Sequence, residues 1–287
     1  MQTVDFEYVL SVLNQVKINQ SIAEIFSEQA TISDKLKKQI DDIKGLLADS
    51  VLTIHPRNQY ESIKHNSYVE CAKFLNIFNH IYSLNYDLLL YWAHMNNNDL
   101  RKNLKDGFWD KIAEKSYFDL NFENNLWPNC KAILYLHGGL HLFLHSATSR
   151  LPYKIICKDG NSLLYEIKKE IQTGKLPLCI TEGAPELKLD KIYQNEYLSS
   201  CYSSFSNSEG VLVTYGVSFT NDSHILSAIK NNEKIKSVYV GIHKKNYEPF
   251  EKVKTLLNST NKKVWCYNSD QTHPWGRQKM SAYREYL

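Results

Sequence analysis

The pattern of hydrophobic positions divides the chain into a helical first part and a mixed second part. From residue 5 to about residue 75 apolar side chains recur at steps of three and four, which place them on one face of a helix. In the clearest stretch they are Leu36, Ile40, Ile43, Leu47 and Val51. This helical run is expected to end at His55 and Pro56, because the residue before a proline avoids the helical conformation.

From about residue 78 short apolar runs are bounded by Gly, Pro, Asn or Asp, at 80–87, 132–138, 176–183, 210–216, 236–242 and 262–268. Several have apolar residues at both of the alternating positions, as in strands of a parallel sheet that helices cover on both faces. Helix-like segments alternate with them, at 163–171, 186–201, 223–230 and 249–257. This alternation predicts an α/β fold with a doubly wound, mostly parallel sheet.

The domain organisation follows from the same change of pattern. We expect a helical segment over residues 1–78, packed as an N-terminal insertion on an α/β core over residues 79–287. No low-complexity linker separates the two parts, so we expect one integrated domain.

Composition excludes several classes of protein. The 287 residues are 43% hydrophobic, enough for a large core, and 34 basic against 31 acidic residues leave a net charge of +3. This charge is too small for a nucleic-acid-binding domain. The apolar stretches are about ten residues at most, too short to span a bilayer, and the first residues lack the basic start of a signal peptide. We therefore expect no membrane and no direct nucleic-acid partner.

The six cysteines stand at positions 71, 130, 157, 179, 201 and 266, and none forms a CxxC pair. This spacing argues against a zinc ribbon and is typical of a reduced, cytoplasmic protein.

Candidate functional residues stand at the predicted strand ends, where ligands bind in open α/β sheets. Asn85 and Asp87 end the first run, and their amide and carboxylate suit a sugar hydroxyl or a water. The alternative is that Asn85 forms a turn and Asp87 caps the next helix.

His137 ends the second run and is followed by Gly138 and Gly139. An imidazole beside open backbone suits a general base, and the alternative is a buried histidine before a glycine turn. His141 and His145 share its face at a spacing of four, which raises a metal site as a weaker alternative. No carboxylate accompanies these histidines in the run, so we expect no metal.

Gly216, Ser218 and Asn221 follow the fourth run and precede a predicted helix, which makes this segment the best nucleotide cradle. Residues 181–183 (TEG) end the third run and either line the same crevice or form a turn before Pro185. The chain has no GxSxG elbow and no GKS or GKT, which argues against an α/β-hydrolase and a P-loop NTPase.

Taken in order, the strand ends SLNYD, LHGG and YGVS resemble the sirtuin-like superfamily of NAD-consuming Rossmann proteins. The blocks DFEYVL, SLNYDLLLYWA and LYLHGGLHLF look closer to one bacterial branch of it, known as a domain of unknown function. The segment with Asn195, Tyr197 and Leu198 also resembles that branch, so the resemblance covers nearly the whole chain.

The resemblance implies a Rossmann-like protein that binds NAD, or an ADP-ribose-type nucleotide, as its substrate. It implies two catalytic residues, Asn85 to orient the ribose or the attacking water and His137 as general base. The residues that it implies for nucleotide binding are Asp87, Gly138, Gly216, Ser218 and Asn221.

The first departure from the family pattern concerns zinc. Deacylating sirtuins carry a zinc module with two CxxC pairs, which this chain lacks, so the resemblance favours NAD+ glycohydrolase activity over deacylation. Related bacterial proteins act in anti-phage defence, which implies a homo-oligomer or a defence-complex partner.

The second departure concerns the start of the chain. The family pattern opens with an apolar strand and a glycine-rich loop, whereas here Met1 lies four residues before Asp5. We therefore expect the sheet to lack this strand and to have a gap bordered by unpaired main-chain groups. The alternative function is then a catalytically silent nucleotide-binding or interaction module.

Overall fold

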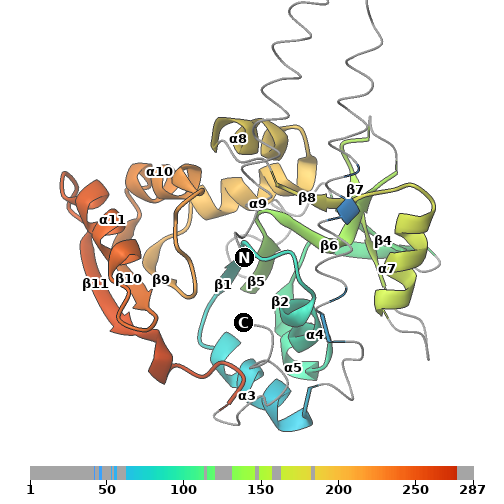
Figure 1. Cartoon of the computed structure of the whole chain (residues 1–287), viewed down its shortest axis with the longest axis horizontal. Coiled ribbons are helices and arrows are strands. Elements are labelled where there is room, and N and C mark those ends of the chain that lie inside the picture. The colour runs from blue at the N-terminus through green and yellow to red at the C-terminus, as the bar shows by residue number, and fades with distance from the viewer. Residues whose placement is uncertain are drawn as a thin grey trace, which may run out of the picture.

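The computed structural model describes residues 42, 45–46, 53, 55–56, 63–112, 115–119, 131–145, 149–156, 163–181 and 185–276. These residues form a mixed α/β structure with two parallel sheets, one antiparallel sheet and eight α-helices (Figure 1). Most of the predicted helical segment, including the stretch from Leu36 to Val51 and the DFEYVL block, lies outside the described residues.

The first parallel sheet has the strand order β1-β5-β2 and holds the second predicted strand at its centre. Its strands are β1 (His80–Ser83), β5 (Lys131–Tyr135) and β2 (Leu104–Lys105). The helices that precede and follow β1 are α3 (His65–Leu75), α4 (Leu89–Met95) and α5 (Asn98–Asn103). Buried Trp92 of α4 and Ile133 of β5 belong to the hydrophobic core.

The second parallel sheet has the order β11-β10-β9, and both of its crossovers are helical. The elements in chain order are β9 (Gly210–Thr214), α10 (Ser223–Asn231), β10 (Ile235–Ile242), α11 (Glu248–Leu257), β11 (Lys263–Asn268) and η1 (Ser269–Gln271). Helix α11 packs on β10 and β11, while Val213, Tyr239 and Trp265 are paired across the three strands and exposed. The sequence predicted burial on both faces, and in this sheet one face carries exposed apolar side chains.

The sheet with antiparallel pairing was not predicted from the sequence. Its order is β3-β4-β7-β6-β8, and helix α7 (Leu163–Gln172) packs on β6 and β7. The strands are β3 (Phe108–Ile112), β4 (Lys115–Phe118), β6 (Gly138–Leu144), β7 (Pro152–Ile155) and β8 (Pro177–Cys179). The run after His137 is therefore a strand, which Gly138 begins with a φ of 77°.

The predicted helix at 186–201 is two helices, α8 (Pro185–Tyr193) and α9 (Glu196–Ser206). Asn195 separates them because its side chain accepts a hydrogen bond from Leu198 N at 3.0 Å, which begins a new helix. The other strands and helices predicted after residue 78 are present, with ends that differ by a few residues.

The described cysteines, Cys71, Cys179, Cys201 and Cys266, form no disulfide. Within the described ranges no helix has the length and apolar character needed to cross a membrane.

Candidate functional site

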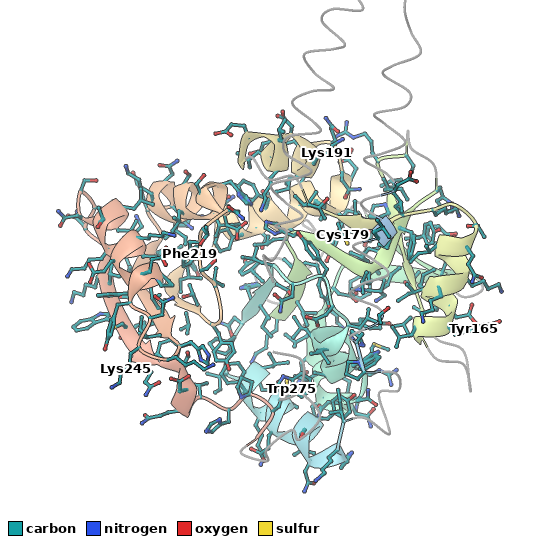
Figure 2. All side chains as sticks on the ribbon, in the orientation of Figure 1. Tyr165, Cys179, Lys191, Phe219, Lys245 and Trp275 are labelled. Atoms are coloured by element: carbon teal, nitrogen blue, oxygen red, sulfur yellow. The ribbon has the colours of Figure 1, made fainter. Side chains whose placement is uncertain are left out.

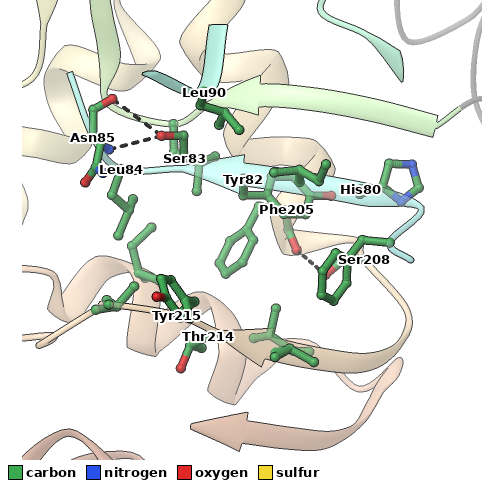
Figure 3. A pocket seen from close by; sticks show the side chains of 18 of the residues that line it. His80, Tyr82, Ser83, Leu84, Asn85, Leu90, Phe205, Ser208, Thr214 and Tyr215 are labelled. Atoms are coloured by element: carbon green, nitrogen blue, oxygen red, sulfur yellow. Dashed lines mark hydrogen bonds between the residues drawn. The ribbon is translucent and has the colours of Figure 1, made fainter. Parts of the chain in front are cut away.

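A cavity of about 1710 Å³ lies between β1 and β9 and extends over their carboxyl ends (Figure 3). The predicted residues that line it are Asn85, Asp87, His137, Gly216 and Ser218. They follow three different strands, so the fold brings three separate predicted strand ends to one space. Gly138 and Asn221 are not among the lining residues.

His137 is held by main-chain hydrogen bonds on both sides. The residue before it, Leu136, donates its N–H to Ser83 O at 2.9 Å, and His137 O accepts from Ile180 N at 2.9 Å. The side chain is 3% exposed, so its position is set by the surrounding structure rather than by solvent. Its Nε2 lies 3.0 Å from Nε2 of His224, in the first turn of α10.

A partly buried ion pair between Lys188 and Asp222 adjoins this histidine pair. Asp222 Oδ1 lies 3.8 Å from His137 Nε2 and 3.1 Å from Nζ of Lys188, which is only 1% exposed. Asp222 lines the cavity, whereas His224 and Lys188 do not. The tetrad of His137, Asp222, His224 and Lys188 thus reaches from the cavity wall into the core.

Burial controls the protonation of the two imidazoles. It lowers the pKa of His137 to about 3 and that of His224 to about 4, while the nearby Asp222 carboxylate opposes both shifts. Both rings are therefore neutral near pH 7, and in their hydrogen bond one Nε2 donates and the other accepts. A neutral His137 can take up a proton, and Asp222 is placed to stabilise the imidazolium that results.

The same groups have the composition of a metal site. Donor atoms of His137, Asp222 and His224 all lie within 4.8 Å of one another. However, the ammonium of Lys188 already contacts the Asp222 carboxylate and would repel a second cation there. The metal site that the sequence analysis raised for His137, His141 and His145 is not formed. His141 stacks on Tyr91, with 4.6 Å between the ring centroids, inside the core, whereas His145 is exposed.

Asn85 and Asp87 also make the turn and helix-start contacts that the sequence analysis gave as the alternative to a role in ligand binding. Asn85 N donates to Ser83 Oγ at 3.1 Å, which closes the turn after β1 (Figure 3). Asp87 Oδ1 accepts from Leu89 N at 2.8 Å at the start of α4. The Asn85 amide makes no hydrogen bond to another described side chain, so it is available to a ligand.

The segment after β9 forms the opposite wall of the cavity. Gly216 has a φ of 68°, and Ser218 Oγ accepts from Thr220 N at 3.3 Å. Phe219 adopts a φ of 59°, unusual for a bulky residue, and its ring is 3% exposed (Figure 2 shows it on the loop between β9 and α10). The buried ring therefore anchors a loop that keeps Ser218 and Gly216 exposed at the cavity.

Of the remaining predicted set at 181–183, only Thr181 belongs to the described residues. Thr181 is buried and does not line the cavity, while Glu182 and Gly183 lie outside the described residues. Asn195 and Tyr197 have structural roles, since Asn195 begins α9 and Tyr197 Oη accepts from Tyr135 N at 3.1 Å.

The sequence analysis assigned no site role to Asp222, His224 or Lys188. A carboxylate and an imidazole two positions apart, shortly after the GVSF segment and next to Asn221, are the signal that could have assigned the first two. Lys188 has no such signal, because only the packing of α8 against α10 brings it to Asp222.

Comparison with known proteins assigns a family and no activity. A family model described as "Domain of unknown function (DUF4917)" matches residues 1–275. No curated protein matches the chain.

Proposed function

This chain belongs to the DUF4917 family, a domain of unknown function, and from the geometry of its cavity we propose that it is an NAD+ glycohydrolase with a sirtuin-like Rossmann core. One observation carries the proposal. Asn85, His137, Gly216 and Ser218, which the resemblance implies for NAD, line a single cavity although they follow three different strands.

In the proposed reaction NAD+ and water give ADP-ribose, nicotinamide and a proton. The bond between ribose C1′ and the nicotinamide nitrogen breaks, and nicotinamide leaves with the bonding electrons as a neutral molecule. Asn85 orients the ribose or the water that adds to C1′. His137, neutral near pH 7 because burial lowers its pKa, accepts the released proton and passes it to solvent.

Other residues that line the cavity would bind the ribose groups of NAD+. Ser218 and Gly216 lie on the wall opposite Asn85, where an exposed hydroxyl and open backbone suit the adenosine ribose. Asp87, with one oxygen on Leu89 N, keeps its other oxygen for a ribose hydroxyl. The resemblance further supports a role in anti-phage defence through depletion of NAD in the cytoplasm, by a homo-oligomer or a defence complex.

One observation favours binding without turnover as a second candidate function. His137 Nε2 already has a partner in His224 Nε2 at 3.0 Å, and its pKa of about 3 makes it a weak base. A catalytically silent module would use the same cavity to hold ADP-ribose or NAD.

The test incubates the full chain with NAD+ and measures released nicotinamide by chromatography, with binding of ADP-ribose measured by calorimetry. We expect turnover in the wild type and a loss of roughly a hundredfold or more in His137→Ala. His145→Ala, which removes an exposed imidazole outside the cavity, is expected to keep wild-type turnover.

Absence of turnover with retained ADP-ribose binding would support the silent module instead. Absence of both, or equal turnover in His137→Ala and the wild type, would overturn the proposed glycohydrolase.

A further inference from the structure

His224 is fixed beside His137 by contacts from two helices. It is 2% exposed in the first turn of α10, and its main-chain O accepts a hydrogen bond from Tyr202 Oη of α9 at 3.1 Å. Its ring stacks on that of His137, with 25° between the planes and 5.2 Å between the centroids. Of the two rings only that of His137 lines the cavity. His224 can therefore act on a ligand there only through His137.

Asp222 does not make the capping bond that its position offers. It is the N-cap of α10, where an aspartate side chain commonly accepts a hydrogen bond from the main chain of the first turn. Here the side chain makes no such bond, although the main-chain O of Asp222 accepts from Ile225 N at 3.0 Å. The carboxylate oxygen instead lies 3.1 Å from Lys188 Nζ and 3.8 Å from His137 Nε2. Because an unused cap weakens the start of a helix, this orientation points to a role at the histidine pair.

The carboxylate of Asp222 favours one direction for the hydrogen bond between the two imidazoles. Both rings are neutral near pH 7, so one Nε2 carries a hydrogen and the other a lone pair. The described ion pairs of Asp222 include His137 and not His224. A negative charge beside Nε2 of His137 attracts an N–H and repels a lone pair. Nδ1 of His224 is buried without a partner among the described residues in either arrangement, so it favours neither.

We infer that His224 is a positioning residue of the candidate site, which holds the proton of His137 on Nε2 and leaves Nδ1 as the nitrogen that accepts a proton from a ligand in the cavity. Asp222, itself held by Lys188, compensates the charge that this proton brings. The effect of His224 on turnover rests on the proposed function, whereas the place of the proton on His137 is a property of the folded chain alone.

The step moves one proton and forms no covalent bond to the protein. Nδ1 of His137 accepts the proton that is released when water adds to ribose C1′, and the ring becomes an imidazolium. Its Nε2–H stays donated to His224, and the cation lies beside the Asp222 carboxylate. Nδ1 then passes the proton to solvent, which restores the neutral ring.

The protonation of His224 agrees with its role as an acceptor. Burial lowers the pKa of His224 to about 4, Asp222 opposes this shift and Lys188 adds to it. At pH 7 the ring therefore keeps the lone pair that an acceptor needs. It acts on His137 as the aspartate of a Ser-His-Asp triad acts on its histidine, by fixing the tautomer and the orientation of the ring.

Long-range 1H–15N NMR of the full chain at pH 7 measures which ring nitrogen of His137 carries the proton. The signals of His137 are assigned by their loss in His137→Ala. We expect Nε2 to be protonated and Nδ1 unprotonated in the wild type, with a coupling across the hydrogen bond to Nε2 of His224. This measurement needs neither turnover nor a folded variant of His224.

Two variants separate the acceptor of His224 from its shape. His224→Phe keeps a ring but removes the acceptor, and it is expected to populate the form of His137 with the proton on Nδ1. The variant is expected to lower kcat roughly tenfold or more and to bind ADP-ribose within about twofold of the wild type. His224→Gln offers an amide oxygen to Nε2–H and is expected to restore the wild-type tautomer and most of the turnover. His65→Phe, exposed on α3, is the matched control and is expected to change neither.

A proton on Nδ1 of His137 in the wild type would overturn the role of His224 even if NAD+ is hydrolysed. An unchanged tautomer or an unchanged kcat in His224→Phe would overturn it as well. If the wild type has the expected tautomer but releases no nicotinamide, the proposed glycohydrolase fails while the positioning of His137 by His224 stands.

Discussion

At the residue scale, Gly138 is the position where the parallel and antiparallel sheets meet. It directly follows His137, begins β6 with a φ of 77°, and pairs with Cys179 of β8. An added Cβ would lie 1.9 Å from Leu178 O, a distance that no rearrangement of a side chain can relieve. The structure therefore explains this glycine by close packing of backbone, whereas the resemblance implied a role in nucleotide binding.

The prediction for Gly138 compares it with Gly174, which has a similar φ of 84° but nothing within 4 Å of an added Cβ. Gly174→Ala is expected to lower the free energy of unfolding by about 1–2 kcal/mol, the cost of the backbone conformation alone. Gly138→Ala adds a backbone clash and is expected to cost roughly 4 kcal/mol or more. Urea denaturation followed by circular dichroism measures both, and equal losses would contradict the close approach to β8.

At the element scale, helix starts are set by single side chains. Asn195 begins α9 by accepting from Leu198 N at 3.0 Å, and its amide donates to Arg150 O at 3.3 Å. The helix then places Tyr197 under β5. The boundary between α8 and α9 thus depends on one residue that is 3% exposed.

Asn195→Ala is expected to lower the free energy of unfolding by about 1–2 kcal/mol, because the start of α9 loses its cap and Arg150 O loses a donor. Asn195→Asp keeps the acceptor for Leu198 N and is expected to lose less. Thermal denaturation compares the two, with Asn207→Ala at the exposed end of α9 as the control. A larger loss for Asp than for Ala would show that the cap is not the main contribution.

At the scale of the whole molecule, buried neutral histidines make stability depend on pH. Burial lowers the pKa of His137 and His141 to about 3 and of His224 to about 4, from 6.5. Between those values and 6.5 the unfolded chain binds more protons than the folded chain. The contribution of these histidines to stability is therefore expected to fall as the pH falls below about 6.5.

Urea denaturation at pH 7, 6 and 5 tests this expectation, with a slope of at most about 1.4 kcal/mol per pH unit for each histidine. His141 has both ring nitrogens buried and without a hydrogen-bond partner. His141→Leu is therefore expected to change stability by about 1 kcal/mol or less at pH 7 and to reduce the slope below pH 6.5. His65→Leu, on the surface, is the control, and equal stability at pH 7 and 5 in the wild type would contradict the prediction.

The sequence by itself determined the elements whose signals are local. Alternating strand and helix patterns located β9, β10, β11, α10 and α11, because apolar periodicity and turn residues lie within each segment. The strand-end rule also selected Asn85 and His137, because β1 and β5 are parallel neighbours that present their carboxyl ends at one edge of a sheet. The same rule selected Ser218, which follows β9 of the second parallel sheet and lines the same cavity.

Only the tertiary structure decided which distant segments meet. The run after His137 has the composition of a strand, but its antiparallel pairing with β7 and β8 depends on residues elsewhere in the chain. His137 and His224 are 87 residues apart in the sequence, and no local pattern predicts that their Nε2 atoms lie 3.0 Å apart in the folded chain. The cavity between β1 and β9 could not be predicted from the sequence either. Strand pairing and burial are properties of surfaces that exist only after the chain has folded.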